Sequence, residues 1–373
     1  MKKTKFQLHQ SSFCSRFNLD EYIILIVIFL SIYSIVIVWS ATGQNIFLIQ
    51  HKLLQIIIGF ISMIIASQIS PRIYENWAVL FYLLSLLLLC YANTFGVVIN
   101  GAQRWLNFGF INFQPSEIIK ISVPLMIAQI VHRTYYPISL NKLGMILFIV
   151  FLPTIFIAMQ PDLGTAMLII ITGFIMLYLT GIQWKIFVGL ILIFFCIIPV
   201  IWFFGMHDYQ RNRINILFSP ERDPLGAGYH IIQSKIAIGS GGLFGKGWLH
   251  GSQSQLEFLP ERHTDFIFAV IAEELGLCGV FLLMILYILL IIRCLLIAIN
   301  TQNLFNKLVV SGITLMFFTC IFVNIGMVSG ILPVVGIPLP LISYGGSYLI
   351  TIMTGFGIIM SIQSHKYFIT KHL

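Results

Sequence analysis

Long runs of apolar residues constrain this chain more than any other feature. About ten of them could cross a bilayer as helices, and a polar stretch of about sixty residues, 206–266, interrupts the series. Of the 373 residues, 58% are hydrophobic and 9% are charged. A water-soluble domain of this size cannot bury so much apolar surface, so lipid must surround most of the chain. We therefore predict an all-α polytopic membrane protein.

The predicted spans alternate with short polar connections. They cover residues 22–40, 49–69, 77–95, 115–131, 143–159, 163–181, 185–205, 267–299, 308–332 and 345–363. The fourth is the weakest, because Glu117 and Lys120 interrupt it. The eighth is too long for one straight crossing, which predicts a tilt or an extension into the cytoplasm.

The distribution of Lys and Arg predicts the orientation. One side of the predicted bundle holds Lys2, Lys3, Lys5, Arg16, Arg72, Arg133, Lys142, Lys185, Arg293, Lys307, Lys366 and Lys371. The short connections opposite hold Arg104 and, at a span edge, Lys52. Positive charge collects on the cytoplasmic side, so both termini are expected there and 206–266 outside. The prediction is one membrane domain, 1–373, with cytoplasmic tails at 1–21 and 364–373 and a large extracytoplasmic loop at 206–266.

Composition also narrows the possible partners. The net charge of +8 suggests nucleic acid at first sight. The basic residues lie mostly at span ends, however, which favours membrane orientation over nucleic-acid binding. The six cysteines form no C-x-x-C pair and lie outside the long loop, so neither a disulfide framework nor a zinc site is predicted.

Asp265 is the most informative single residue. It ends the polar stretch, directly before an apolar run that begins at Phe266. A carboxylate at the boundary between water and lipid can lose its proton to solvent and still reach a substrate whose tail lies in the bilayer. The alternative is an N-cap for the helix that follows.

Four further charged residues are expected on the same outer side. Glu117 and Lys120 share a helix face and can pair, either to lock two helices structurally or to serve a function. Asp162 either caps the next helix, takes part in function, or does both. Arg104 lies in another outer connection, so with Asp265 the outer side gathers three acids and two bases.

Two glycine- or proline-rich segments punctuate the chain. The stretch 239–247 resembles a phosphate-binding P-loop but lacks its pattern, since Ser240 and Gly247 stand where Gly and Ser or Thr are required. We interpret its glycines as tight turns. The segment 333–340 contains three prolines and is either a re-entrant, groove-lining path or a rigid connector.

One of Glu273 and Glu274 is expected to face the bundle interior.

Several motifs together resemble one family. They are Gly101–Trp105, Phe113–Glu117, Gln160–Thr165, Asp223–Tyr229, Pro260–Phe266 and Asn324–Ser347. On these the chain resembles the SEDS proteins (shape, elongation, division and sporulation) over nearly its whole length. One departure is Tyr348, which stands where the family usually has a small residue.

The resemblance implies a peptidoglycan glycosyltransferase of the bacterial inner (cytoplasmic) membrane. Such proteins polymerise lipid II into glycan strands at the outer face during cell-wall elongation and rod-shape maintenance. They work with a class B penicillin-binding transpeptidase and other elongation proteins. The resemblance places Asp265 on the family's essential loop aspartate, and Glu117, Lys120 and Asp162 on its polar cavity. It also implies a possible divalent cation, magnesium or manganese, whose ligands nothing in this sequence marks.

The expected reaction is a single inverting displacement, in which an acceptor sugar hydroxyl attacks the anomeric carbon of the donor. A base must take the hydroxyl proton, and Asp265 is the predicted base. The pyrophosphate leaving group needs positive charge, for which Arg104 and Lys120 are the candidates and Arg211, Arg213 and Arg262 weaker ones. The alternatives are a lipid II flippase and a non-catalytic scaffold for a transpeptidase. A flippase should carry its charges at mid-depth instead of at one face.

Overall fold

The computed structural model describes residues 18–99, 102–107, 112–134, 139–206, 208–223, 226–256, 258–259 and 261–370. Its long helices form a bundle: α2 (Glu21–Ala41), α3 (Ile46–Gln68), α4 (Pro71–Phe95), α5 (Pro115–His132), α6 (Leu140–Met159), α7 (Leu163–Leu179), α8 (Trp184–Val200), α12 (Ile267–Asn300), α13 (Leu304–Val328) and α14 (Gly346–Thr370). Within the segment 206–266 lie the helices α9 (Asp208–Phe218), α10 (Ala227–Ser240) and α11 (Ser252–Gln255). The short turns η1 (Ile201–Gly205) and η2 (Pro220–Arg222) precede and follow α9.

The prediction of a helical, polytopic membrane protein is confirmed. In the described part of the chain, seven helices are long and apolar enough to cross a membrane, namely α2, α3, α4, α6, α12, α13 and α14. The apolar helices α7 and α8 are shorter, at 17 residues each. Helix α5 coincides with the predicted fourth span and buries both of its charged residues, Glu117 and Lys120. The count of ten spans stays a prediction.

Side-chain caps mark where several of these helices begin. Asp20 accepts from the Ile23 amide at the start of α2, and Asn45 and Asn303 do the same work at α3 and α13. These side chains satisfy amides that lack a partner in the first helical turn. Helices α4 and α5 instead begin with proline, whose missing N–H costs nothing at that position.

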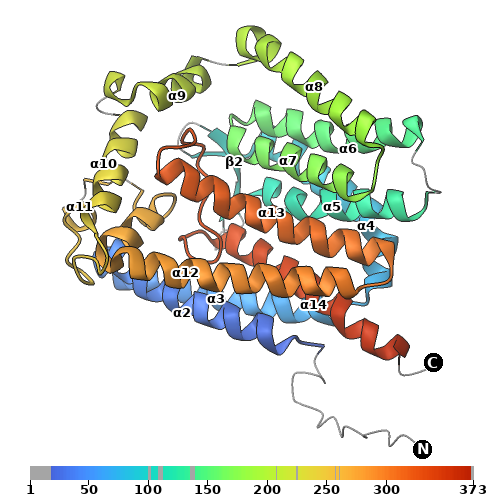
Figure 1. The fold of residues 1–373 in the computed structure, drawn as a ribbon, viewed down its shortest axis with the longest axis horizontal. Coiled ribbons are helices and arrows are strands. Elements are labelled where there is room, and N and C mark those ends of the chain that lie inside the picture. The colour runs from blue at the N-terminus through green and yellow to red at the C-terminus, as the bar shows by residue number, and fades with distance from the viewer. Residues whose placement is uncertain are drawn as a thin grey trace, which may run out of the picture.

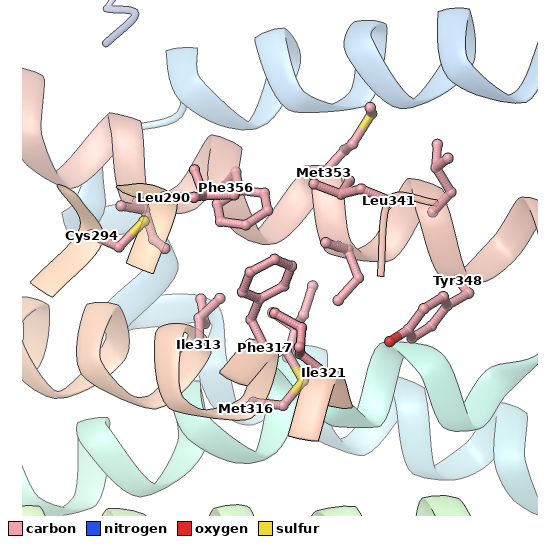
Figure 2. Close-up of a cluster of buried hydrophobic side chains, with 14 of the residues drawn as sticks. Leu290, Cys294, Ile313, Met316, Phe317, Ile321, Leu341, Tyr348, Met353 and Phe356 are labelled. Atoms are coloured by element: carbon pink, nitrogen blue, oxygen red, sulfur yellow. The ribbon is translucent and has the colours of Figure 1, made fainter. Parts of the chain in front are cut away.

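Helix α13 lies at the centre of the bundle, in contact with α5, α7, α12 and α14. Figure 2 shows the apolar cluster that α13 forms with its neighbours. Phe317 meets Phe356 of α14 edge-to-face at 5.1 Å between ring centroids, and Tyr287 of α12 at 5.7 Å. The outer helices leave many large apolar side chains exposed, as expected where lipid is the solvent.

Helix α12 is broken near its start. Gly276 has φ 65° and ψ −161°, so the predicted eighth span is kinked there and does not run as one long helix. The glycine-rich turn packs into the break: the amides of Lys246 and Gly247 donate to the carbonyls of Glu273 and Glu274, each at 3.0 Å. A side chain on Gly245 would collide with this backbone. Positive φ at Gly242, Gly245 and Gly247 confirms the prediction of tight turns.

The segment 206–266 is largely folded and gathers at one end of the bundle. Figure 1 shows α9, α10 and α11 at the end opposite to the start of α2 and the end of α14. Helix α10 packs on α12 and α13, and its Ser234 hydroxyl donates to the Val328 carbonyl at 2.8 Å. Helix termini at this end of the bundle therefore lie beside the polar segment 206–266.

Three short strands, which the sequence did not predict, lie between α4 and α5. They are β1 (Val97–Ile99), β2 (Ala102–Asn107) and β3 (Asn112–Phe113), paired antiparallel in the order β1-β2-β3. Leu106 of β2 pairs with Phe113 of β3, directly before α5. Arg104 is therefore held on a strand that leads into the helix carrying Glu117 and Lys120.

Candidate functional site

Asp162 organises the polar groups at the start of α7. Its Oδ1 accepts from the Thr165 amide at 3.1 Å, which confirms the predicted helix cap. Its Oδ2 accepts from the Thr165 hydroxyl at 3.0 Å and from Gln114 Nε2 at 2.9 Å. The same oxygen lies 3.4 Å from Arg104 Nη1. One buried carboxylate thus joins α7, β2 and the residue that precedes α5.

Glu117 and Lys120 form a buried ion pair in the first turns of α5. Lys120 Nζ donates to both carboxylate oxygens of Glu117 at 2.9 Å, and each residue is less than 5% exposed. The Lys120 ammonium also lies 4.8 Å from the ring centroid of Tyr348 on α14. The pairing expected from their spacing is confirmed. Burying two charges is costly even when they are paired, which favours a functional reason for keeping them.

Asp265 lies in the turn that precedes α12 and does not cap that helix. The N-cap is Phe266, and no side chain caps there, so the alternative interpretation of Asp265 as a cap is wrong. Among the described residues, none donates a hydrogen bond to its carboxylate, which is half-buried. Burial chiefly raises the pKa of Asp265, to about 7. The carboxylates of Glu261 and Asp162 raise that pKa further, while Arg104 and Arg213 lower it.

The proline-rich segment 333–340, for which the sequence left a groove-lining path and a rigid connector open, lies against Asp265. Gly336 has φ 73°, and a Cβ built on it would lie 3.5 Å from Asp265 Oδ2. Asn324 of α13 donates to the Asp265 carbonyl at 3.0 Å and to the Ile337 carbonyl at 2.7 Å. Farther along, a side chain on Gly164 of α7 would collide with the Val335 carbonyl. The segment therefore packs on α7 and α13 beside the carboxylate of Asp265.

Direct contacts join four of the five predicted site residues in two ion pairs. Arg104 contacts Asp162 directly, and Glu117 contacts Lys120. The charges of Asp162 and Arg104 act on Glu117 and on Asp265, which links the two halves of the site.

The three weaker arginine candidates, Arg211, Arg213 and Arg262, differ in what they bind. Arg213 donates to the Val334 carbonyl at 3.3 Å and lies close enough to Asp265 to affect its pKa. Arg211 instead donates to the Trp202 and Phe203 carbonyls, and Arg262 to the Ser254 carbonyl. Of the three, Arg213 is the one whose charge reaches the site.

One of Glu273 and Glu274 was expected to face the bundle interior, but both are fully buried. Glu273 accepts from Lys246 Nζ at 2.8 Å and from the amides of Gln253 and Ser254. Glu274 accepts from the Ser40 hydroxyl at 2.6 Å. Both carboxylates hold the glycine-rich turn and α11 against the bundle, away from the charges around Asp265.

Some residues of the site escaped the sequence analysis. Gln114 and Thr165 bind Asp162. Both lie in motifs on which the family resemblance rests, but neither is charged and neither was assigned a role in the site. Asn324, an amide within an apolar span, carries a clearer signal. Lys52 was placed at a span edge but is fully buried within α3.

The described residues do not offer a ready metal site. No group of three or more His, Cys, Asp or Glu side chains with suitable geometry occurs in that part of the chain. Both Glu117 oxygens bind Lys120, and both Asp162 oxygens bind protein donors. These carboxylates of the described residues therefore do not fit the divalent cation that the resemblance implies.

Comparison with known proteins identifies the family. Residues 17–368 match the FtsW/RodA/SpoVE family model, described as cell cycle protein. The chain is 53% identical to the peptidoglycan glycosyltransferase MrdB of Escherichia coli K12, over 97% of this chain and 98% of that one. It is 38% identical to MrdB of Helicobacter pylori, over 83% and 81% of the two chains.

Solved structures agree with these relatives. A chain of a peptidoglycan synthase complex superposes with a TM-score of 0.81 at 31% identity, covering 93% of this chain and 98% of that one. The rod shape determining protein RodA of Thermus thermophilus superposes with a TM-score of 0.71 at 28% identity, covering 93% and 97%. The resemblance to SEDS proteins is confirmed. The chain belongs to the FtsW/RodA/SpoVE family of cell cycle proteins.

Proposed function

We propose that this chain, a peptidoglycan glycosyltransferase that polymerises glycan strands, uses Asp265 as the general base of the transfer. The enzyme class rests on 53% identity to the Escherichia coli glycosyltransferase over 97% of the chain. The role of Asp265 rests on one observation: among the described residues its carboxylate accepts no hydrogen bond, and its pKa is raised to about 7. A base works best when its pKa lies near the operating pH.

In the proposed reaction, two lipid II molecules bind with their prenyl tails in the bilayer. The acceptor hydroxyl attacks the anomeric carbon of the donor as the bond to the pyrophosphate breaks, and Asp265 takes the hydroxyl proton. The displacement inverts the anomeric centre, so no covalent enzyme intermediate is needed. Holding both substrates in line contributes more to the rate than the proton transfer does.

Positive charge for the pyrophosphate is proposed to come from Arg104, Lys120 and Arg213. Lys120 and Arg104 each have a carboxylate partner, Glu117 and Asp162, which reduces the net charge that they present. Arg213 binds a neutral carbonyl and keeps its full charge for an anion near Asp265. We therefore give Arg213 a larger role than its place in the polar segment suggested.

The proposed setting is the bacterial cytoplasmic membrane, crossed ten times, with both termini inside and 206–266 outside. The separation of α9–α11 from the start of α2 and the end of α14 is consistent with that arrangement. The proposed partner is a class B penicillin-binding transpeptidase. In support, the relative with the TM-score of 0.81 belongs to a peptidoglycan synthase complex.

Purified enzyme with lipid II in detergent or liposomes tests the proposal. Asp265→Asn should lower the rate of glycan polymerisation by about 10²–10⁴-fold, the usual contribution of a general base. Asp208→Asn is the matched control, since Asp208 is an exposed acid on α9 that pairs with the nearby Arg211. Wild-type polymer from Asp265→Asn would discard the assignment of the base.

The same liposomes separate the rival functions. Translocation of lipid II without polymer would favour a flippase, and neither activity would favour a scaffold. The clustering of Arg104, Asp162 and Asp265 around one end of the bundle favours chemistry at one face over passage through the bilayer.

A further inference from the structure

Lys52 is a buried lysine that the proposed reaction does not use. Its side chain is 0% exposed, and Nζ donates to the carbonyls of Ile342 at 3.2 Å and Ser343 at 2.8 Å. None of the ion pairs among the described residues includes Lys52. A buried charge without a counter-charge is costly, and an apolar side chain at this place in α3 would avoid that cost. Such a residue calls for a reason.

The carbonyls that Lys52 binds belong to an irregular segment, residues 339–345, between α13 and α14. Ser34 of α2 also donates to the Ile342 carbonyl, at 2.7 Å, and Tyr287 of α12 donates to the Pro340 carbonyl at 2.5 Å. Leu341 has φ 63°, a conformation that L side chains rarely adopt and that surrounding contacts must hold. Side chains from three helices thus fix one short piece of backbone.

That piece of backbone in turn holds the turn that carries Asp265. The Ser343 hydroxyl donates to the Thr264 carbonyl at 2.6 Å and accepts from the Leu339 amide at 2.7 Å. The Tyr344 amide donates to the His263 carbonyl at 2.9 Å. A single residue, Ser343, therefore binds both Lys52 and the neighbour of Asp265.

We propose that Lys52 is a positioning residue for glycosyl transfer, because it clamps residues 339–345 and this segment sets the place of the Asp265 carboxylate. The proposal rests on the proposed role of Asp265 as the base. An ammonium group suits the task, because it can donate to two carbonyls at once and binds each more strongly than a neutral donor does. Lys52 itself touches no reacting atom in this scheme.

The test compares Lys52→Met with Met63→Ala in the purified full-length enzyme. Met63 lies on the same helix, is 1% exposed and belongs to the apolar core, so its truncation lowers stability but removes none of the hydrogen bonds to residues 339–345 described above. Lys52→Met should lower kcat for lipid II polymerisation by about 10–100-fold, as expected for a misplaced catalytic group, with KM within about twofold. Met63→Ala should lower Tm and leave kcat unchanged.

Two further readouts separate positioning from plain stability. In Lys52→Met the amides of Leu339 and Tyr344 should exchange with deuterium faster than in the wild type, and in Met63→Ala they should not. The pH midpoint of kcat should move down, because a loosened turn hydrates Asp265; Glu261, Arg104, Asp162 and Arg213 are the charged groups that act on it in either case.

A second pair of variants covers the possibility that Lys52→Met does not fold. Ser343→Ala removes the link to Thr264 and should show the same fall in kcat on a smaller scale, while Lys52→Gln keeps a donor and should recover part of the loss. Wild-type kcat and midpoint in Lys52→Met, or in Ser343→Ala if the former cannot be purified, would overturn the inference. Full activity in Asp265→Asn would instead overturn the proposed base, whatever Lys52 does.

Discussion

Two acids, Asp265 and Glu273, differ in the hydrogen bonds that their carboxylates accept. They are eight residues apart, one before the start of α12 and one inside it. Glu273 accepts hydrogen bonds from Lys246, Ser252, Gln253 and Ser254. Among the described residues nothing donates to the Asp265 carboxylate. A carboxylate saturated by donors holds structure, whereas one left without them keeps its lone pairs for a substrate proton.

The largest effect is expected at Asp265, where a substitution should lower activity but not stability. Asp265→Asn should lower the polymerisation rate by about 10²–10⁴-fold. The same variant should be at least as stable as the wild type at pH 8. A carboxyl whose folded pKa is raised from 3.8 to about 7 contributes stability below pH 3.8 and loses it as the pH rises to about 7. Thermal unfolding of both proteins at pH 5 and pH 8 checks this, and a Tm of Asp265→Asn below that of the wild type at pH 8 would contradict it.

The opposite result is expected at Glu273. Glu273→Ala leaves the amides of Gln253 and Ser254 without their acceptor and the partly exposed Lys246 without its ion-pair partner. Each buried donor left unsatisfied costs about 1–3 kcal/mol of unfolding free energy. Unfolding in detergent should show a clear fall in Tm. The residual activity of the folded fraction should stay within a few-fold of the wild type. Glu273→Gln, which keeps part of the hydrogen bonding, is the matched variant and should lose less. If the folded fraction of Glu273→Ala were inactive, the division between structural and catalytic acids would fail.

The pH dependence of the reaction sharpens the same contrast. With Asp265 as the base, kcat should rise about tenfold per pH unit below its pKa and level off above about pH 7. Initial rates of polymerisation between pH 5 and pH 9 provide the measurement. Asp208→Asn should leave the curve in place. A rate that is flat through this range would show that ionisation of Asp265 does not limit the step.

The smallest effect is expected at Tyr348, whose ring lies 4.8 Å from the Lys120 ammonium. A desolvated cation–π contact contributes about 0.5–2 kcal/mol. Tyr348→Ala should weaken lipid II binding by a few-fold through Lys120, and Tyr348→Phe, which keeps the ring, should bind as the wild type does. The affinity of each variant for lipid II is the measurement. If both variants bind lipid II equally weakly, the aromatic ring plays no role. This residue, flagged as a departure from the family, thus packs over the charged pair.

Much of the fold could be read from local pattern. Apolar runs predicted the helices and their approximate bounds, since a helix in lipid needs little more than length and apolar side chains. The break in α12 was missed, because Gly276 within an apolar run looks like any other small residue. Its φ of 65° is needed only because a distant turn, residues 241–247, donates to the freed carbonyls.

The sequence likewise identified some residues of the site and missed others. Charged residues in apolar surroundings stood out, so Asp265, Glu117, Lys120, Asp162 and Arg104 were all nominated. Lys52 was assigned to a span edge, and the partners Gln114 and Thr165 were quoted in motifs but not nominated as site residues. Their contacts join segments far apart in the sequence, and one-dimensional spacing holds no information about such pairings.

The sequence by itself determined that this chain lives in lipid, which acids and bases it keeps there, and the family to which its motifs point. These follow from composition and local order, where the free energy of burying each side chain is decided residue by residue. Only the tertiary structure decided which acid is satisfied and which is left free. That outcome depends on where the glycine-rich turn and α11 meet α12, because their donors must converge within about 3 Å to bind the Glu273 carboxylate.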